Sequence, residues 1–205
     1  MIEAHIKNQN LNFETDNTVF SPAGIDTGTL AMLSQVEFSR HDKVLDLGCG
    51  YGVVGLTAAK IIGEDGIIMC DISEDAIRLS RKNAILNGLA HMDIRQSNAY
   101  ENIPERDFTM ILSNPPYHTD FSVAKGFIEK GFHKLVSGGK MVMVTKRLDW
   151  YKNKLTAIFG GVKVHEIDGY YVFTAEKRQA AIPKRQEKNK GGLSKKLQRK
   201  YRNVK

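Results

Sequence analysis

The sequence predicts an α/β fold: a mostly parallel seven-stranded sheet with helices on both faces and an antiparallel hairpin at its C-terminal end. Residues 42–175 alternate short apolar runs with longer helical patterns, which is typical of parallel strands joined by crossover helices. A glycine-rich turn at 48–52 follows the first apolar run. Near the end, Asp168-Gly169 separates two strand patterns, and this dipeptide is a strong hairpin signal.

The elements follow from apolar periodicity and from cap and turn residues. Parallel strands are expected at 43–47, 66–70, 92–96, 107–112 and 140–145. Helices are expected at 53–62, from the N-cap Ser73 to Asn87-Gly88, and at 123–135. A turn is expected at Ser137-Gly138-Gly139, and the hairpin strands at 162–167 and 170–175.

The chain is predicted to hold one domain with an extension at each end. Residues 1–29 form an N-terminal extension, in which Leu11 to Phe20 is expected to be a pair of short strands around Asp16-Asn17. Residues 30–176 form the α/β domain, and residues 177–205 form a basic, disordered tail.

Composition excludes several classes of protein. No apolar stretch approaches a membrane span, and the first ten residues lack the layout of a signal peptide. The two cysteines, Cys49 and Cys70, lie in apolar segments without metal-ligand spacing, so we expect reduced core thiols and no metal. These features indicate a cytoplasmic protein that does not bind membranes.

Basic charge is concentrated in the tail. Residues 177–205 hold 12 Lys or Arg and one acid, which gives +11, and the other 176 residues hold 18 basic and 22 acidic groups, which gives −4; the sum is the net charge of +7. Phosphate polyanions are the natural partner of such a segment. The alternative is a tail that only keeps the protein soluble.

The glycine-rich turn has the pattern D-x-G-x-G-x-G, from Asp46 to Gly52. Glycines allow a tight turn and a close approach of the backbone to a ligand. A dinucleotide-binding turn would be G-x-G-x-x-G, but Val53 takes the third glycine's place when counted from Gly48. This pattern, like an antiparallel strand near the end of the sheet, favours the Rossmann-like class I methyltransferase fold with S-adenosylmethionine as cofactor.

The cofactor site is expected at the carboxyl ends of the strands. Asp71 ends the second strand and could accept hydrogen bonds from both ribose hydroxyls, while Asp46 could hold the loop or the cofactor's ammonium group. Asn98 could contact the adenine or be an exposed turn residue. The predicted cofactor-binding residues are Asp46, Gly48, Gly50, Asp71, Ile72, Asn98, Ala99 and Asn114.

The segment Ser113-Asn114-Pro115-Pro116-Tyr117-His118 follows the fourth strand and carries the predicted chemistry. A planar amine is a poor nucleophile because its lone pair is delocalised. If the Asn114 side-chain oxygen and the Pro115 carbonyl each accept an N–H, the lone pair turns towards the methyl group. Pro116 stiffens the loop and Tyr117 offers a stacking face, so we assign Asn114, Pro115, Pro116 and Tyr117 as catalytic.

Two upstream elements make the prediction more specific. Together with the two motifs above, Thr18-Val19-Phe20-Ser21 and Gly24-Ile25-Asp26-Thr27-Gly28-Thr29 resemble the small-subunit ribosomal RNA guanine-N2 methyltransferase family. The resemblance covers about residues 10–176 and is to short single-domain bacterial homologues of its catalytic half. It implies methylation of guanine N2 in 16S rRNA, free or in the small ribosomal subunit. By similarity, Phe20 and residues 26–29 would close over the site.

RNA contacts are expected in the loop and in the tail. The predicted substrate-binding residues are Phe20, Tyr117, His118, Lys195, Lys196 and Arg199, although His118 could be a local hydrogen-bonding residue. Leu193, Leu197 and Tyr201 would form one apolar stripe if the tail became helical on RNA.

Three other functions compete with this prediction. Release-factor glutamine N5-methyltransferases and adenine-N6 nucleic-acid methyltransferases also use the NPPY motif. An RNA-binding or ribosome-assembly protein with a vestigial methyltransferase fold is the non-enzymatic alternative. Intact Asp46, Gly48, Gly50, Asp71 and Asn114 argue against the last.

Overall fold

The computed structural model describes residues 1–116 and 121–178 and contains the predicted seven-stranded sheet. The strand order is β5-β4-β3-β6-β7-β9-β8, and β9 runs antiparallel to both of its neighbours while the remaining pairs are parallel. The strands are β3 (Val44–Leu47), β4 (Ile67–Asp71), β5 (Asp93–Gln96), β6 (Phe108–Ser113), β7 (Leu135–Thr145), β8 (Lys163–Ile167) and β9 (Tyr170–Glu176). The predicted fold class is confirmed.

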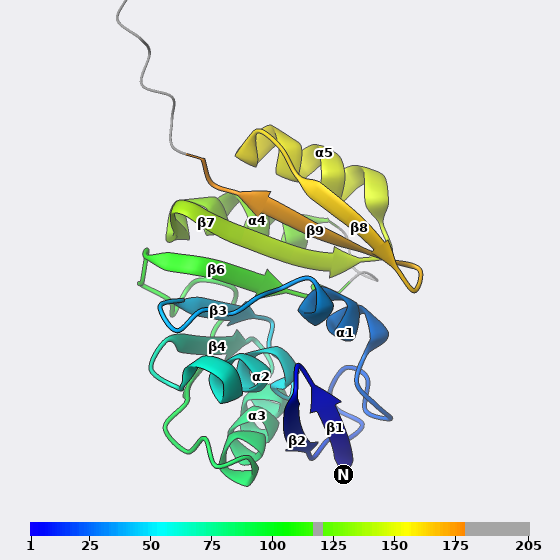
Figure 1. Cartoon of the computed structure of the whole chain (residues 1–205), viewed down its shortest axis with the longest axis vertical. Helices are drawn as coiled ribbons and strands as arrows, with labels where there is room; N and C mark the ends of the chain where they lie inside the picture. Colours follow the sequence, from blue (N-terminus) through cyan, green and yellow to red (C-terminus); the bar gives the residue numbers. More distant parts are fainter. Residues whose placement is uncertain (117–120, 179–205) are drawn as a thin grey trace, which may run out of the picture.

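Helices cover both faces of the sheet (Figure 1). The helices are α1 (Thr27–Ser34), α2 (Val53–Ile62), α3 (Glu74–Leu86), α4 (Ser122–Lys134) and α5 (Leu148–Phe159). Residues of α1, α2 and α3 belong to one hydrophobic cluster, and those of α4 and α5 to a second cluster on the other face. Burial of these two apolar layers holds the sheet between them.

The predicted cap and turn signals act as expected. The Ser73 hydroxyl accepts a hydrogen bond from the Ala76 N–H, and Asn87 is the C-terminal cap of α3. Asp168 and Gly169 have φ angles of 49° and 76°, as a two-residue hairpin turn with two left-handed residues requires. Cys49 and Cys70 are buried free thiols.

The N-terminal hairpin differs from the predicted one. Its strands are β1 (Ile2–Ile6) and β2 (Gln9–Phe13), and the chain turns at Lys7-Asn8 rather than at Asp16-Asn17. The hairpin is anchored on α3, because Asn87 Oδ1 accepts from the Asn12 N–H and Asn87 Nδ2 donates to the Asn12 carbonyl. These contacts satisfy an edge of the hairpin and place it beside α3.

The predicted turn at 137–139 lies inside β7. The pairing between β6 and β7 shifts there, because Phe108 pairs with Leu135 whereas Met110 pairs with Lys140. Hydrogen bonds from the Gly138 N–H to the Lys177 carbonyl and from the Lys177 N–H to the Gly139 carbonyl continue the ladder. The glycines therefore form an irregularity within a long strand.

Two helices, α1 and α5, were not among the predicted helices. Figure 1 shows α1 beside the ends of β6 and β7 towards which the parallel arrows point. α1 therefore lies at the carboxyl ends of the parallel strands. Across the described residues, no helix is long and apolar enough to span a membrane.

Candidate active site

A cavity of about 380 Å³ lies where the parallel strands end. Its walls come from the glycine turn after β3, the end of β4, the loop after β5 and the segment after β6, with residues 18–29 closing one side. The predicted site residues that line it are Phe20, Asp46, Gly48, Gly50, Asp71, Ile72, Asn98, Ala99, Asn114, Pro115 and Pro116. Residues far apart in the sequence thus meet in one cavity of ligand size.

The glycine turn leaves backbone open to the cavity. Gly48 and Gly50 have φ angles of 79° and 55°, a left-handed conformation that favours glycine, and a Cβ at either position would meet no atom within 4 Å. Asp71 fixes the turn, because its Oδ2 accepts from the Gly50 N–H at 2.9 Å and its Oδ1 from the Ser73 N–H at 2.9 Å. The turn is therefore held open by the acid that ends β4.

Asp46 lies deeper beneath the same turn and is 2% exposed. Its Oδ2 accepts a hydrogen bond from the Gly55 N–H at 2.8 Å, which ties β3 to the first turns of α2. Burial raises the pKa of the Asp46 carboxyl to about 7, with the nearby Asp71 carboxylate adding to the increase. A bound cation would favour the ionised form of Asp46.

Apolar side chains stand exposed around the cavity. Phe20 is 52% exposed and Ile72 is 64% exposed, and both line the cavity with Val123. Exposed apolar groups that gather at a concave site commonly contact a ligand. A flat, weakly polar group such as an adenine ring suits this lining.

Asn98 turns its amide nitrogen towards a neighbour, because Nδ2 donates to Glu101 Oε1 at 2.9 Å. The next residue, Ala99, has a φ of 51°, a strained value for a residue with a Cβ. The amide oxygen is the atom of Asn98 that could accept a hydrogen bond from a ligand.

Asn114 is held by contacts from outside its own segment. Its Nδ2 donates to Asp26 Oδ2 at 2.8 Å and to Thr29 Oγ1 at 3.1 Å. The preceding residue is fixed as well, since Ser113 Oγ donates to the Leu47 carbonyl at 2.7 Å. The Asn114 amide is therefore oriented by two acceptors at the start of α1.

Asp26, Thr29 and Tyr170 complete a group that the sequence motifs did not resolve. Asp26 caps α1 by accepting from the Thr29 N–H at 2.8 Å, and Tyr170 Oη donates to Asp26 Oδ1 at 3.2 Å. The pattern Asp-x-Gly-Thr before an apolar helix was a signal for the cap. The contact with Asn114, 88 residues away, had no local signal.

Five predicted substrate or catalytic residues cannot be placed in the same way. Tyr117, His118, Lys195, Lys196 and Arg199 lie outside the described residues. Their predicted roles stay predictions.

The cavity fits the predicted cofactor in two respects. Asp46 and Asp71 line it, and in the part of the chain that the structure describes neither forms an ion pair. A ligand that carries an ammonium and a sulfonium group would offset this negative charge. The N-cap of α2 is Gly52, which has no side chain to cap the helix, so the N–H groups that precede Gly55 can receive a carboxylate.

Known proteins resemble this chain in sequence. The uncharacterized protein YbxB of Bacillus subtilis is 32% identical over 84% of this chain and 89% of its own length. Ribosomal RNA small subunit methyltransferase C of Klebsiella pneumoniae is 36% identical over 77% of this chain. The match covers 46% of that enzyme, so this chain spans about half the length of such relatives.

A solved structure and a family model agree with these relatives. The 16S rRNA N2 G1207 methyltransferase of Thermus thermophilus, in complex with AdoMet and guanosine, superposes with a TM-score of 0.79 at 26% identity, over 86% of this chain and 50% of that one. The model of the Methyltransferase small domain matches residues 10–174. The predicted resemblance is confirmed, and the chain belongs to the Methyltransferase small domain family.

Proposed function

We propose that this chain transfers a methyl group to an exocyclic amino group of an RNA base, with guanine N2 in 16S rRNA as its substrate. S-adenosylmethionine is the cofactor of this methyltransferase. The observation that carries the proposal is the meeting of two features in one cavity: the glycine turn with Asp71, and the acceptors of Asn114-Pro115.

Each group has a separate task in the proposed reaction. When bound, the cofactor supplies an electrophilic methyl group on a sulfonium. Asp71 would bind the ribose hydroxyls, Asp46 would bind the ammonium group, and Ile72 would contact the adenine. The Asn114 side-chain oxygen and the Pro115 carbonyl would each accept an N–H from the amine, which frees its lone pair. The C–N bond would form as the methyl–sulfur bond breaks and leaves a neutral thioether, and the amine's spare proton would then pass to water, so no strong base is needed.

Guanine is favoured over the rival substrates by the relatives. The methyltransferase from Thermus thermophilus with TM-score 0.79 binds guanosine and modifies N2 of a 16S rRNA guanine. The Klebsiella pneumoniae relative is also a small-subunit rRNA methyltransferase. Methyltransferases that act on glutamine N5 or on adenine N6 also use the NPPY motif. An experiment is therefore needed to distinguish these substrates from guanine.

The substrate can be identified with labelled cofactor. The full chain is incubated with small ribosomal subunits, free 16S rRNA, tRNA or a release factor, and the labelled product is hydrolysed and identified. We expect N2-methylguanosine from 16S rRNA. Label on glutamine or at adenine N6 would overturn the proposed base, and cofactor binding without transfer to any of the four would support a non-enzymatic role.

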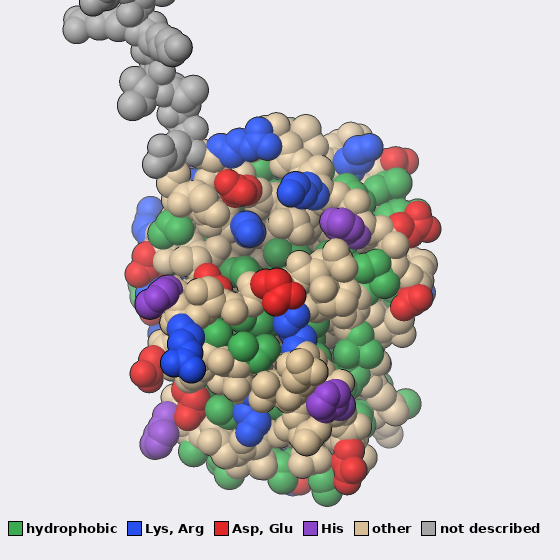
Figure 2. Space-filling view, in the orientation of Figure 1, with side chains coloured by type: hydrophobic (Ala, Val, Ile, Leu, Met, Phe, Trp, Pro, Cys, Tyr) green, Lys and Arg blue, Asp and Glu red, His purple; other side chains and the backbone are tan. Residues whose placement is uncertain are grey.

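We also propose that the basic tail binds RNA phosphates. Figure 2 shows Lys and Arg side chains interspersed with Asp and Glu over the visible face of the body, without one dominant basic block. Lys177 belongs with the sheet, since its Nζ donates to the Leu135 carbonyl at 2.7 Å. A truncation should therefore remove residues 179–205 and leave Lys177 in place.

Salt dependence tests the tail. Each tail cation that contacts a phosphate should contribute about 0.7 to 0.9 to the slope of log affinity against log salt. Truncation at 178 should flatten this slope, and replacing Lys195, Lys196 and Arg199 with glutamine should flatten it in part. An unchanged slope in the truncated protein would reject the tail as an RNA-binding element.

A further inference from the structure

The Asp26 carboxylate makes four hydrogen bonds at the edge of the cavity, and they connect three parts of the fold. Its Oδ2 accepts from the Thr29 N–H at 2.8 Å, from the Thr29 hydroxyl at 3.3 Å and from Asn114 Nδ2 at 2.8 Å. Its Oδ1 accepts from Tyr170 Oη at 3.2 Å. The carboxylate thus links the start of α1, the segment after β6 and the antiparallel strand β9.

The Asn114 amide nitrogen faces α1. It donates to Asp26 Oδ2 and to Thr29 Oγ1, which lies 3.1 Å from the same nitrogen. Flipping the amide would put its oxygen against a carboxylate, which has no proton to donate. This pairing fixes which amide atom is left for a substrate in the cavity: the oxygen.

Glycine at position 28 allows the three parts to meet. A Cβ there would lie 2.6 Å from two ring carbons of Tyr170 and 2.9 Å from Asp26 Oδ2. The glycine therefore lets the Tyr170 ring approach α1 closely enough for its hydroxyl to reach the carboxylate. Lys146 Nζ lies 4.8 Å from the centre of the Tyr170 ring.

We infer that Asp26 is a positioning residue for Asn114: its Oδ2 holds the amide nitrogen, so that the amide oxygen is presented to the methyl-accepting amine. The inference rests on the proposed amino methylation for its consequence in catalysis. The antiparallel strand gains a role as well, because Tyr170 orients the carboxylate that orients Asn114. Neither Asp26 nor Tyr170 needs to touch the reacting atoms for this.

Two substitutions of Asp26 separate orientation from charge. Asp26→Asn keeps an oxygen where Oδ2 accepts from Thr29 and Asn114, and its new amino group can donate to Tyr170 Oη. Asp26→Ser keeps the helix cap, because serine is a good N-cap residue, but is too short to hold the Asn114 amide. We expect Asp26→Ser to lower kcat by about 100-fold, the size expected when a reacting group is misplaced, and Asp26→Asn to restore most of this loss.

Binding and stability measurements accompany the rates. Cofactor affinity and KM for RNA should stay near the wild-type values in Asp26→Ser, because the lost interaction acts on the amine in the transition state. Asp42→Ser is the matched control: Asp42 accepts from the Ser39 N–H at 2.7 Å and from the Thr109 hydroxyl at 2.8 Å, and lies before β3, at the opposite end of the sheet. It should leave kcat unchanged.

A measurement without substrate keeps this test separate from the proposed function. In the ¹⁵N-labelled protein, the Asn114 side-chain amide, identified by its loss in Asn114→Ala, should exchange slowly with water. Exchange should become fast in Asp26→Ser and stay slow in Asp26→Asn. Equal exchange in wild type and Asp26→Ser would overturn the inference, as would a parallel loss of kcat and cofactor affinity. Absence of methyl transfer by the wild type would instead reject the proposed function.

Discussion

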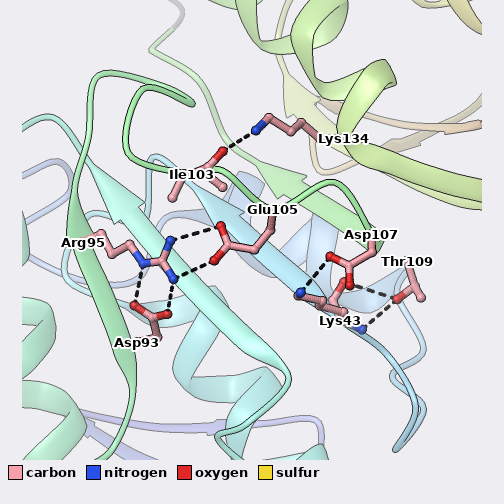
Figure 3. A network of polar contacts seen from close by, with 8 residues as sticks. All are labelled: Lys43, Asp93, Arg95, Ile103, Glu105, Asp107, Thr109 and Lys134. Atoms are coloured by element: carbon pink, nitrogen blue, oxygen red, sulfur yellow. Dashed lines mark hydrogen bonds and ion pairs between the residues drawn. The ribbon is translucent and has the colours of Figure 1, made fainter.

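Charged side chains are paired at one end of the parallel strands and face a cavity at the other. At the amino-terminal end, Lys43 Nζ lies 2.7 Å from Asp107 Oδ1, and on the edge strand β5 Arg95 contacts both Asp93 and Glu105 (Figure 3). The Arg95 guanidinium holds the pKa of Glu105 below its usual value. These charges are neutralised within the protein, as in a structural network.

At the carboxyl-terminal end, acids face a cavity instead. Asp26, Asp46 and Asp71 accept hydrogen bonds from backbone or side-chain donors, and within the described residues none has a Lys or Arg partner. Burial favours the neutral form of Asp46 by raising its pKa to about 7, and a carboxylate in a concave site is costly unless a ligand supplies the counter-charge. We infer that the charged groups at the amino-terminal end stabilise the fold, and that those at the carboxyl-terminal end serve binding and catalysis.

Replacing one aspartate at each end should give the largest contrast. Asp71→Ala removes the acceptor for the Gly50 and Ser73 N–H groups and the proposed ribose contact. Loss of two hydrogen bonds between the Asp71 carboxylate and the ribose hydroxyls, at about 1.5 to 3 kcal/mol each, predicts a loss of cofactor affinity of about 100-fold or more. Calorimetric titration with S-adenosylmethionine measures it.

Asp107→Ala is the control for that titration. It breaks the exposed pair with Lys43 and should leave cofactor affinity unchanged. Similar affinity losses in the two variants would contradict the division between the ends.

The buried acid Asp46 predicts a dependence of stability on pH. Its pKa is raised by burial from 3.8 to about 7 in the folded protein, so the unfolded chain releases this proton at a lower pH than the folded one. The ligand-free protein should therefore lose stability as pH rises from about 4 through about 7. Urea unfolding across this range measures the loss.

Asp46→Asn should flatten that dependence, since the amide does not titrate. Cofactor affinity should rise with pH over the same interval in the wild type, because the carboxylate is the form that attracts an ammonium group. A wild-type pH slope retained in Asp46→Asn would assign the effect to another group.

The smallest effect is expected on the edge strand β5. Arg95→Met removes the contacts with Asp93 and Glu105, which are partly exposed, and should lower the free energy of unfolding by about 1 kcal/mol or less. Methyl transfer should be unaffected. A large fall in kcat without loss of stability would mean that this network supports the site.

Local patterns predicted most of the sheet because each strand and cap carries its own signal. Ser73, Asn87 and Asp168-Gly169 act within a few residues of their positions. The N-terminal hairpin was misplaced because Lys7-Asn8 and Asp16-Asn17 are both plausible turns. The choice is made by the Asn87 amide on α3, a contact across 75 residues.

The site shows the same limit. The glycine turn, Asp71 and Asn114 could be recognised from the sequence because each follows an apolar strand, and strands of a parallel sheet end together. The family resemblance placed Asp26 near the site, but its hydrogen bonds with Asn114 and Tyr170 could not be predicted, because they depend on how α1 packs against the sheet. α5 is a different case. Its buried Tyr151, Leu155 and Phe159 recur at helical spacing, so this helix could have been predicted from the sequence.

The most direct test of the account is the rate of methyl transfer by Asn114→Ala at saturating cofactor. Loss of a preorganised transition-state contact predicts a fall in kcat of about 100- to 1,000-fold, with cofactor affinity largely intact. Asn10→Ala, which removes an exposed contact with His5 on the N-terminal hairpin, should transfer methyl groups at the wild-type rate. Unchanged turnover in Asn114→Ala would contradict the central claim that this side chain prepares the amine for methylation.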